Sequence, residues 1–130
     1  MRMLENFKPY NLTIGLPAVS FTANGITFNK SAVTKIGKPS HVIFYINELD
    51  KQIAIVPCAK EDENATQFYK PNARNVVSVR WNNKDLLTTI YSMMDWNIDT
   101  DNYKTNGNYY SKENVMIFNL REVTPITTIE

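Results

Sequence analysis

The chain has 130 residues, of which 43% are hydrophobic and 21% are charged, and its formal net charge is +1. These values fit one globular domain and exclude a chain that is disordered throughout or fibrous. A net charge near zero also excludes a protein whose whole surface is committed to phosphate backbones, although it allows a local basic patch.

Cysteine usage and hydropathy define the expected compartment. A single cysteine, Cys58, cannot form an internal disulfide. No stretch has the pattern of a signal peptide, and no apolar run approaches about 18 residues. We therefore expect a cytoplasmic protein without membrane contact.

The first predicted elements are an extended arm, a hairpin and a short helix. Residues 1–15 show no sustained periodicity and predict the arm. From Ala18, apolar residues alternate on both sides of Asn24-Gly25, a dipeptide typical of tight hairpin turns because both residues accept positive φ. Asn29 has the position of an N-cap for a helix over 30–36, and Gly37 is placed to end that helix.

A second hairpin and a linker follow. The apolar run 41–46 and the alternating stretch 52–56 flank a polar turn at 47–50, which predicts two paired strands. Residues 59–75 are polar and contain the acidic run 61–63. We therefore predict that they form a surface linker between two halves.

The second half repeats the order of strand, helix and hairpin. The stretch 76–81 predicts a strand, and Asn83 precedes a helix whose apolar stripe extends to Met94. The polar stretch 99–114 predicts a long hairpin connection that turns at Asn106-Gly107. Residues 115–118 form the last predicted strand, and the short tail 124–130 is β-prone.

The two predicted helix starts align at a constant offset, which favours an internal duplication, although two unrelated helices can share a cap and an apolar face. The matching positions are Asn29, Lys30, Thr34 and Ile36 in the first helix and Asn83, Lys84, Thr88 and Ile90 in the second. The expected fold is one β-rich α+β domain in which two pseudo-equivalent strand–helix–hairpin units, 18–58 and 76–123, pack into one sheet or barrel-like core. A monomer with an internal pseudo-two-fold and a homodimer both remain open.

The first half resembles the swapped-hairpin domain of AbrB- and MazE-type transcription regulators over about residues 19–57. The resemblance is carried by Asn24-Gly25, the strand 26–28, the short helix ended by Gly37, and the closing strand 53–57. Tandem copies in one chain look like the MraZ arrangement. The resemblance implies a transcription regulator that binds double-stranded DNA without a cofactor. The stretches GITFNKSAV and IAIVPC also resemble small uncharacterised proteins of bacterial mobile elements, which implies no activity.

Basic residues on both halves suggest a nucleic-acid-binding surface. The predicted contacts are Asn24, Asn29, Lys30, Lys35, Lys38, Arg80 and Lys84, with the lysines and Arg80 on phosphates and the asparagines near base edges. The competing interpretation is that scattered lysines only solvate a helix.

The alternative function is a protein-interaction or structural module, with contacts predicted at Tyr109, Tyr110 and Phe118. The two tyrosines also suit stacking on unpaired bases, or a cover over the sheet. We expect no enzyme, because neither an acid–base pair nor a nucleophile with its base is evident. We also expect no metal or cofactor, because the acidic stretch around Asp99 and Asp101 departs from the EF-hand pattern.

Overall fold

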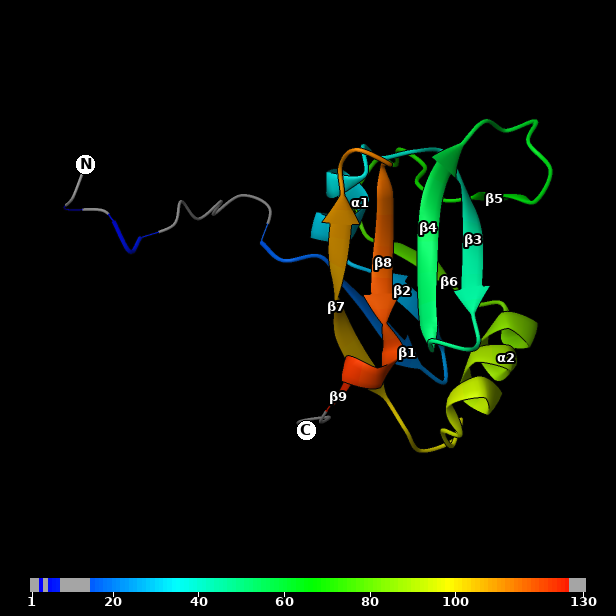
Figure 1. Ribbon diagram of the computed structural model, residues 1–130. Helices are drawn as coiled ribbons and strands as arrows, with labels where there is room; N and C mark the ends of the chain where they lie inside the picture. The colour runs from blue at the N-terminus through cyan, green and yellow to red at the C-terminus, as the bar shows by residue number, and fades with distance from the viewer. Residues whose placement is uncertain (1–2, 4, 8–14, 127–130) are drawn as a thin grey trace.

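A curled antiparallel sheet forms most of the structure, which is a computed structural model that describes residues 3, 5–7 and 15–126 (Figure 1). The fold is a β-rich α+β half-barrel with few helices. Its elements are β1 (Ala18–Thr22), β2 (Gly25–Phe28), α1 (Lys30–Lys35), β3 (His41–Asn47), β4 (Gln52–Cys58), β5 (Ala65–Gln67), β6 (Val79–Trp81), α2 (Lys84–Met94), β7 (Tyr103–Tyr110), β8 (Val115–Asn119), the 3-10 turn η2 (Leu120–Glu122) and β9 (Thr124–Pro125).

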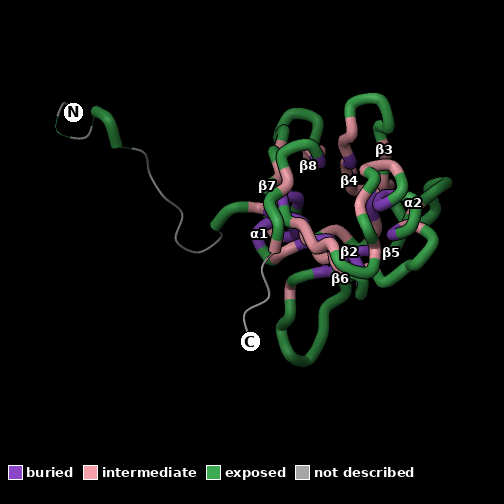
Figure 2. Tube along the Cα trace, turned by 90° about the horizontal axis from the view of Figure 1, so that it is seen from below, coloured by how far each residue is buried: buried purple, intermediate pink, exposed green. Residues whose placement is uncertain are grey.

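The strands follow the order β5-β3-β4-β8-β7-β1-β2-β6, and β9 adds to β7. The sheet curls so far that its two end strands approach each other. The side-chain Nε1 of Trp81 in β6 donates a hydrogen bond to the carbonyl oxygen of Gln67 in β5, at 3.1 Å. Figure 2 shows the buried residues gathered inside this curl, with exposed residues on the loops around it.

One hydrophobic core joins both halves of the chain. Its largest fully buried side chains include Phe21 and Phe28 from the first half and Tyr91 and Phe118 from the second. Phe28 lies 5.8 Å from Phe118 between ring centroids, and 5.1 Å from Trp81 in an edge-to-face arrangement. The two halves therefore bury their apolar faces against each other.

The predicted hairpins are confirmed. Thr22 pairs with Gly25 across the first turn, and Asn47 pairs with Gln52 across the second. Only Gly25 of the Asn24-Gly25 pair has positive φ, at 147°. A Cβ at Gly25 would lie 2.5 Å from the carbonyl oxygen of Trp81, so close backbone packing also requires glycine there.

Both predicted helix caps are confirmed. The Oδ1 atom of Asn29 accepts from the backbone N–H of Ala32 at 2.9 Å, and that of Asn83 accepts from Leu86 at 3.0 Å. Gly37 follows α1 with φ of 94°, as predicted, whereas α2 ends on Asp95 in the left-handed conformation. The two helices lie at opposite sides of the half-barrel (Figure 1).

The predicted turn at Asn106-Gly107 is wrong, because both residues lie inside the strand β7. This strand pairs with β1 through its first half and with β8 through its second half. A Cβ at Gly107 would lie 2.6 Å from a ring carbon of Phe118. The glycine therefore makes room for a core side chain rather than for a turn.

The connecting segments also differ from the prediction. The predicted surface linker 59–75 contains β5 and the buried Phe68. The predicted strand 76–81 begins only at Val79. The β-prone tail contributes β9, while its last residues, 127–130, lie outside the described residues, as does most of the predicted arm.

Candidate nucleic-acid interface and an adjacent groove

The outer face of the β2–β6 ladder is the first candidate surface. Ile26, Phe28 and Val79 point into the core, and the alternation of a strand therefore turns Thr27 and Arg80 outward. Thr27 and Arg80 are direct partners in the ladder, and Arg80 Nε donates to Thr27 Oγ1 at 3.4 Å. Arg80 is exposed, so its guanidinium is available at the centre of this face.

Three more predicted contacts flank this ladder. β2 and β6 are antiparallel, and each is followed by a helix. Lys30, the first residue of α1, and Lys84, the first residue of α2, therefore lie at opposite ends of the ladder. Asn24 directly precedes Gly25, which packs on Trp81, so this asparagine lies toward the Lys84 end. All three side chains are exposed. The cationic face, defined as Asn24, Lys30, Arg80 and Lys84, therefore combines both halves.

The structure does not add the other predicted contacts to this face. Lys35 and Lys38 follow at the far end of α1. The Asn29 side chain accepts from the N–H groups of Ala18 and Ala32 and donates Nδ2 to the carbonyl of Leu16 at 2.9 Å. These bonds use both ends of its amide and give Asn29 a structural role, while its contact with base edges stays a prediction.

The alternative protein contacts are also separated by burial. Phe118 is fully buried in the core, so it is not a surface contact. Tyr110 is 46% exposed, and Tyr109 is half-buried and donates its hydroxyl to Asn114 Oδ1 at 2.8 Å. Of the three residues, Tyr110 is the one that the fold presents openly to solvent.

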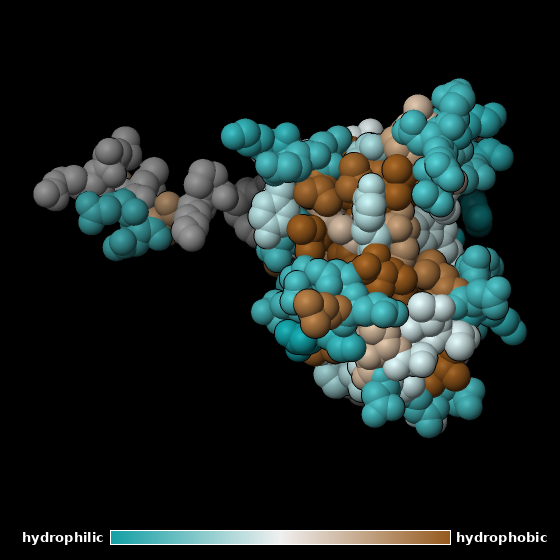
Figure 3. All heavy atoms as spheres, turned by 45° about the vertical axis from the view of Figure 1, so that its right-hand side comes forward, coloured by the Kyte–Doolittle hydropathy of each residue, from teal (hydrophilic) through white to brown (hydrophobic). Residues whose placement is uncertain are grey.

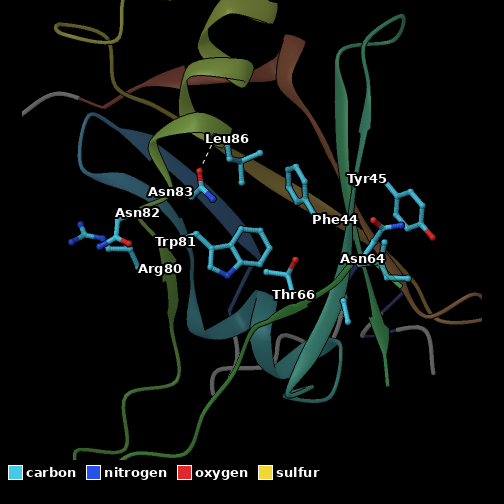
Figure 4. A pocket seen from close by; sticks show the side chains of 11 residues that line it. Phe44, Tyr45, Asn64, Thr66, Arg80, Trp81, Asn82, Asn83 and Leu86 are labelled. Carbon is cyan, nitrogen blue, oxygen red and sulfur yellow. Dashed lines mark hydrogen bonds between the residues drawn. The ribbon is translucent and has the colours of Figure 1, made fainter. Parts of the chain in front are cut away.

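A groove of about 710 Å³ opens between β6 and the N-terminal end of α2 on one side, and β3 and β5 on the other. Figure 4 shows Phe44, Trp81 and Leu86 in the middle of the cavity, with Arg80 and Asn82 toward its edge. Figure 3 views the molecule with the right-hand side of Figure 1 turned forward. Apolar side chains form a band across this face, and polar residues surround it. The residues that line the groove are Ile43, Phe44, Tyr45, Asn64, Ala65, Thr66, Arg80, Trp81, Asn82, Asn83 and Leu86.

One edge of β3 is free along this groove. β5 pairs with β3 only from His41 to Ile43, so the stretch 44–47 has no partner strand on that side within the described residues. The N–H of Phe68 donates to the carbonyl oxygen of Ser40 at 2.7 Å, on the β5 side of β3. On the other side, Val42 of β3 faces Pro57 of β4, which has no N–H to donate. Since antiparallel bonding alternates, even-numbered residues of β3 direct their backbone groups to the β5 side. The N–H groups of Phe44 and Ile46 thus point along the open edge.

The groove is open because the chain turns away before β5. Asn64 has φ of 69°, and Ala65 N–H donates to Asp62 at 3.1 Å, which closes a turn. The segment before β5 therefore leaves β3 instead of running beside Phe44.

The corresponding edge of β7 is covered by the chain itself. Gly107 N–H donates to the carbonyl of Pro17 at 2.9 Å, so residues before β1 continue along β7. The start of α1 holds the same segment, because Asn29 Nδ2 donates to Leu16 and Ser31 Oγ donates to Gly15 at 3.1 Å. From here on, the arm means residues 15–17 alone, the segment that lies between β7 and α1.

Other groups of chemical interest have structural surroundings. Partial burial and the Asp62 carboxylate raise the pKa of the Cys58 thiol, which leaves less thiolate at neutral pH. Burial and nearby Asp101 raise the pKa of Tyr91 to about 12, and its hydroxyl donates to the Asp101 carbonyl at 2.8 Å. Within the described part of the chain, no three His, Cys, Asp or Glu residues gather as a metal site, and no helix is long and apolar enough to span a membrane.

Comparison of the chain with family models, with curated proteins and with solved structures gave no match in any of the three. Sequence reasoning also missed the groove. Its wall residues come from three separate stretches of the sequence, 43–45, 64–66 and 80–86, and Asn83 was recognised only as a helix cap. The one available signal was the long apolar run 41–46, which exceeds what a short partner strand covers.

Proposed function

We propose that this chain is a non-enzymatic nucleic-acid-binding module, in which two fused strand–helix–hairpin units of the swapped-hairpin type present the cationic face to double-stranded DNA. The observation that carries the proposal is the antiparallel β2–β6 pairing, with Arg80 at its centre and Lys30 and Lys84 at its two ends.

The strand pairings support two equivalent units. If β1, β2, β3 and β4 correspond to β5, β6, β7 and β8, then the β1–β7 pairing corresponds to β5–β3, and the β3–β4 hairpin corresponds to β7–β8. The β2–β6 and β4–β8 pairings each correspond to themselves, as expected for strands on a pseudo-two-fold axis. Two pairings lack a counterpart. The β1–β2 pairing has none because β5 and β6 face each other across the groove, and the β7–β9 pairing has none because no described strand corresponding to β9 pairs with β3.

The strand registers agree with the same correspondence. The pair Phe44↔Ile55 in the first hairpin shifts by 63 residues (44 to 107 and 55 to 118) onto the pair Gly107↔Phe118 in the second. The same shift exchanges the pairs Ile53↔Phe118 and Ile55↔Met116 between β4 and β8. Burial follows the register, since Val42, Ile53 and Ile55 and their counterparts Thr105, Met116 and Phe118 are all buried.

This arrangement suits a duplex. A DNA duplex has two-fold symmetry, and a protein with cations placed about a two-fold axis contacts both strands alike. Lysine and arginine that neutralise phosphates release counterions, which supplies sequence-independent affinity. The net charge of +1 is compatible with this because only one face has to be cationic.

Binding of a random duplex, followed by fluorescence anisotropy at several salt concentrations, tests the proposal. We expect affinity that falls steeply with salt. The double variant Arg80→Glu/Lys84→Glu should bind at least about 10-fold more weakly at low salt, because two phosphate contacts no longer release counterions. Each lost contact should also reduce the slope of log affinity against log salt concentration by about 0.9.

The matched control is Lys112→Glu, which reverses an exposed charge in the turn between β7 and β8. It changes net charge by the same amount per site but lies outside the cationic face. Absence of duplex binding by the native chain at 50 mM salt, or equal losses in the control and in single cationic-face variants, would reject the proposal.

A further inference from the structure

The described part of the molecule contains two grooves of the same construction, and the arm fills one of them while no described residue fills the other. In each groove a long strand (β7 or β3) faces the N-terminal end of a helix (α1 or α2) that begins with an asparagine cap. The arm occupies the groove between β7 and α1. The groove between β3 and α2 is open, with a volume of about 710 Å³.

The arm shows which groups such a groove offers to an extended backbone. The strand gives one N–H, from Gly107 to Pro17, and the cap amide gives a second donor, from Asn29 to Leu16. In the open groove Phe44 takes the place of Gly107, and its N–H faces the free edge. Asn83 takes the place of Asn29: its Oδ1 caps α2, and within the described residues no partner is bonded to its Nδ2.

The lining of the open groove specifies the side chains of its occupant. Arg80 is its one charged residue, and Figure 4 shows that side chain directed away from Phe44 and Trp81. Leu86, Phe44 and Trp81 supply apolar surface. The groove thus fits an uncharged extended segment with apolar residues at alternate positions, which adds to the edge of β3 as a further strand.

The chain contains a segment of this kind directly before the arm. Residues 9–14, PYNLTI, are uncharged, and Tyr10, Leu12 and Ile14 alternate with the polar residues Asn11 and Thr13. They lie outside the described residues and extend over about 20 Å when fully stretched. Gly15, the next residue in the sequence, is bound beside α1, on the other side of the molecule from α2 (Figure 1). The point at which this segment joins the described chain is therefore far from the open groove of the same molecule, which favours the groove of a second molecule.

We infer that residues 9–14 of a second copy of this chain bind in the groove between β3 and α2. The segment pairs with the free edge at Phe44 and Ile46 and accepts a hydrogen bond from Asn83 Nδ2. The exchange is reciprocal, so two molecules close into a symmetric dimer. This inference does not rest on DNA binding: its bonding groups are the β3 edge and Asn83, and Arg80 is the one residue that the groove shares with the cationic face.

Sedimentation velocity of the 130-residue chain over a range of micromolar concentrations tests the inference. We expect a reversible dimer in the native chain. The double variant Leu12→Asp/Ile14→Asp should raise the dimer Kd at least 10-fold, because it brings two charges into an uncharged groove. Its matched control, Asn11→Asp, adds a charge on the opposite face of the segment and should raise the Kd much less.

Variants of the groove provide the second arm of the test. Ile46→Pro removes an N–H from the free edge, and Asn83→Ser keeps a capping oxygen while removing Nδ2. We expect at least a 10-fold increase of the Kd for Ile46→Pro and a several-fold increase for Asn83→Ser. Leu86→Lys serves in place of Ile46→Pro if circular dichroism shows that the proline variant is unfolded.

The outcomes are distinct. A native chain that stays monomeric at every concentration overturns the inference, and so does a dimer whose Kd is unchanged by both the segment variant and the groove variants. A synthetic peptide of residues 9–14 that dissociates the native dimer supports it, provided that the same peptide with Leu12→Asp/Ile14→Asp does not.

Discussion

The edges of β3 and β7 differ by one short segment of chain. Beside β7 the backbone runs straight on from β1 through Pro17, whereas beside β3 the chain turns away at Asn64, which has φ of 69°. The first edge is therefore bonded within the molecule, and the second is left open over a groove. The comparison teaches that in this fold the path of the chain just before β1 and β5 decides whether the neighbouring strand edge is covered, because an edge without a neighbouring segment keeps unpaired N–H and C=O groups.

The largest expected effect separates the two sides of β3. Tyr45→Pro removes an N–H that the alternation directs into the β4 ladder, so we expect a loss of about 3 kcal/mol or more in the free energy of unfolding. Ile46→Pro removes an N–H on the free edge and should cost much less in a monomer. Urea denaturation at low protein concentration measures both, and equal losses would show that Ile46 is also bonded within the molecule.

A second comparison uses the related positions Gly107 and Phe44. Any side chain at Gly107 meets the ring of Phe118, so Gly107→Leu should destabilise by about 3 kcal/mol through overpacking. Phe44 is half-buried beside the open groove, and Phe44→Leu should cost less than about 1.5 kcal/mol. Thermal and urea denaturation give both values. A Gly107→Leu variant as stable as the native chain would place β7 differently from the register described here.

The two helix caps give a smaller difference. Asn83→Ala removes one capping bond and should cost about 1 kcal/mol. Asn29→Ala also removes the bonds to Ala18 and to the arm carbonyl of Leu16, so we expect about 2 kcal/mol. The two variants are compared by urea denaturation. Equal losses would mean that the arm contributes nothing to the stability of the α1 side.

The helix ends provide the smallest effect. Gly37 and Asp95 both have positive φ, which is unstrained for glycine and strained for other residues. Asp95 also places a negative charge at the C-terminal end of α2, where the helix dipole disfavours it. Asp95→Gly should therefore stabilise the chain by about 0.5 to 1 kcal/mol, while Gly37→Ala should destabilise it by about 1 kcal/mol. Melting temperatures of the two variants should move in opposite directions, and a decrease in both would contradict this account.

Elements with local signals were predictable from the sequence. The turn at Asn24-Gly25, the caps Asn29 and Asn83 and the stop at Gly37 are set by neighbouring residues, and the structure has all of them. Long-range pairing decided the rest. The sequence of β7 is polar and was predicted as a connection, because its strand conformation depends on pairing with the distant strands β1 and β8. β5 is only three residues long, and it is a strand only through its pairing with β3.

The candidate surfaces show the same limit. Lys30, Arg80 and Lys84 were predicted as basic residues of the two halves, but their common face depends on the pairing of β2 with β6. No spacing in the sequence indicates that Phe44 and Leu86 line one groove. The open edge arises from the difference between Pro17 and Asn64, which becomes visible only when the two strands are compared in space.

Residue-resolved amide hydrogen exchange by NMR tests the free edge of β3 most directly. In dilute, monomeric protein this account predicts slow exchange at Gly107, whose N–H is bonded to Pro17, and fast exchange at Phe44 and Ile46. As concentration rises and a second copy binds, the amides of Phe44 and Ile46 should become protected. Strong protection of both amides in the dilute monomer would contradict the account.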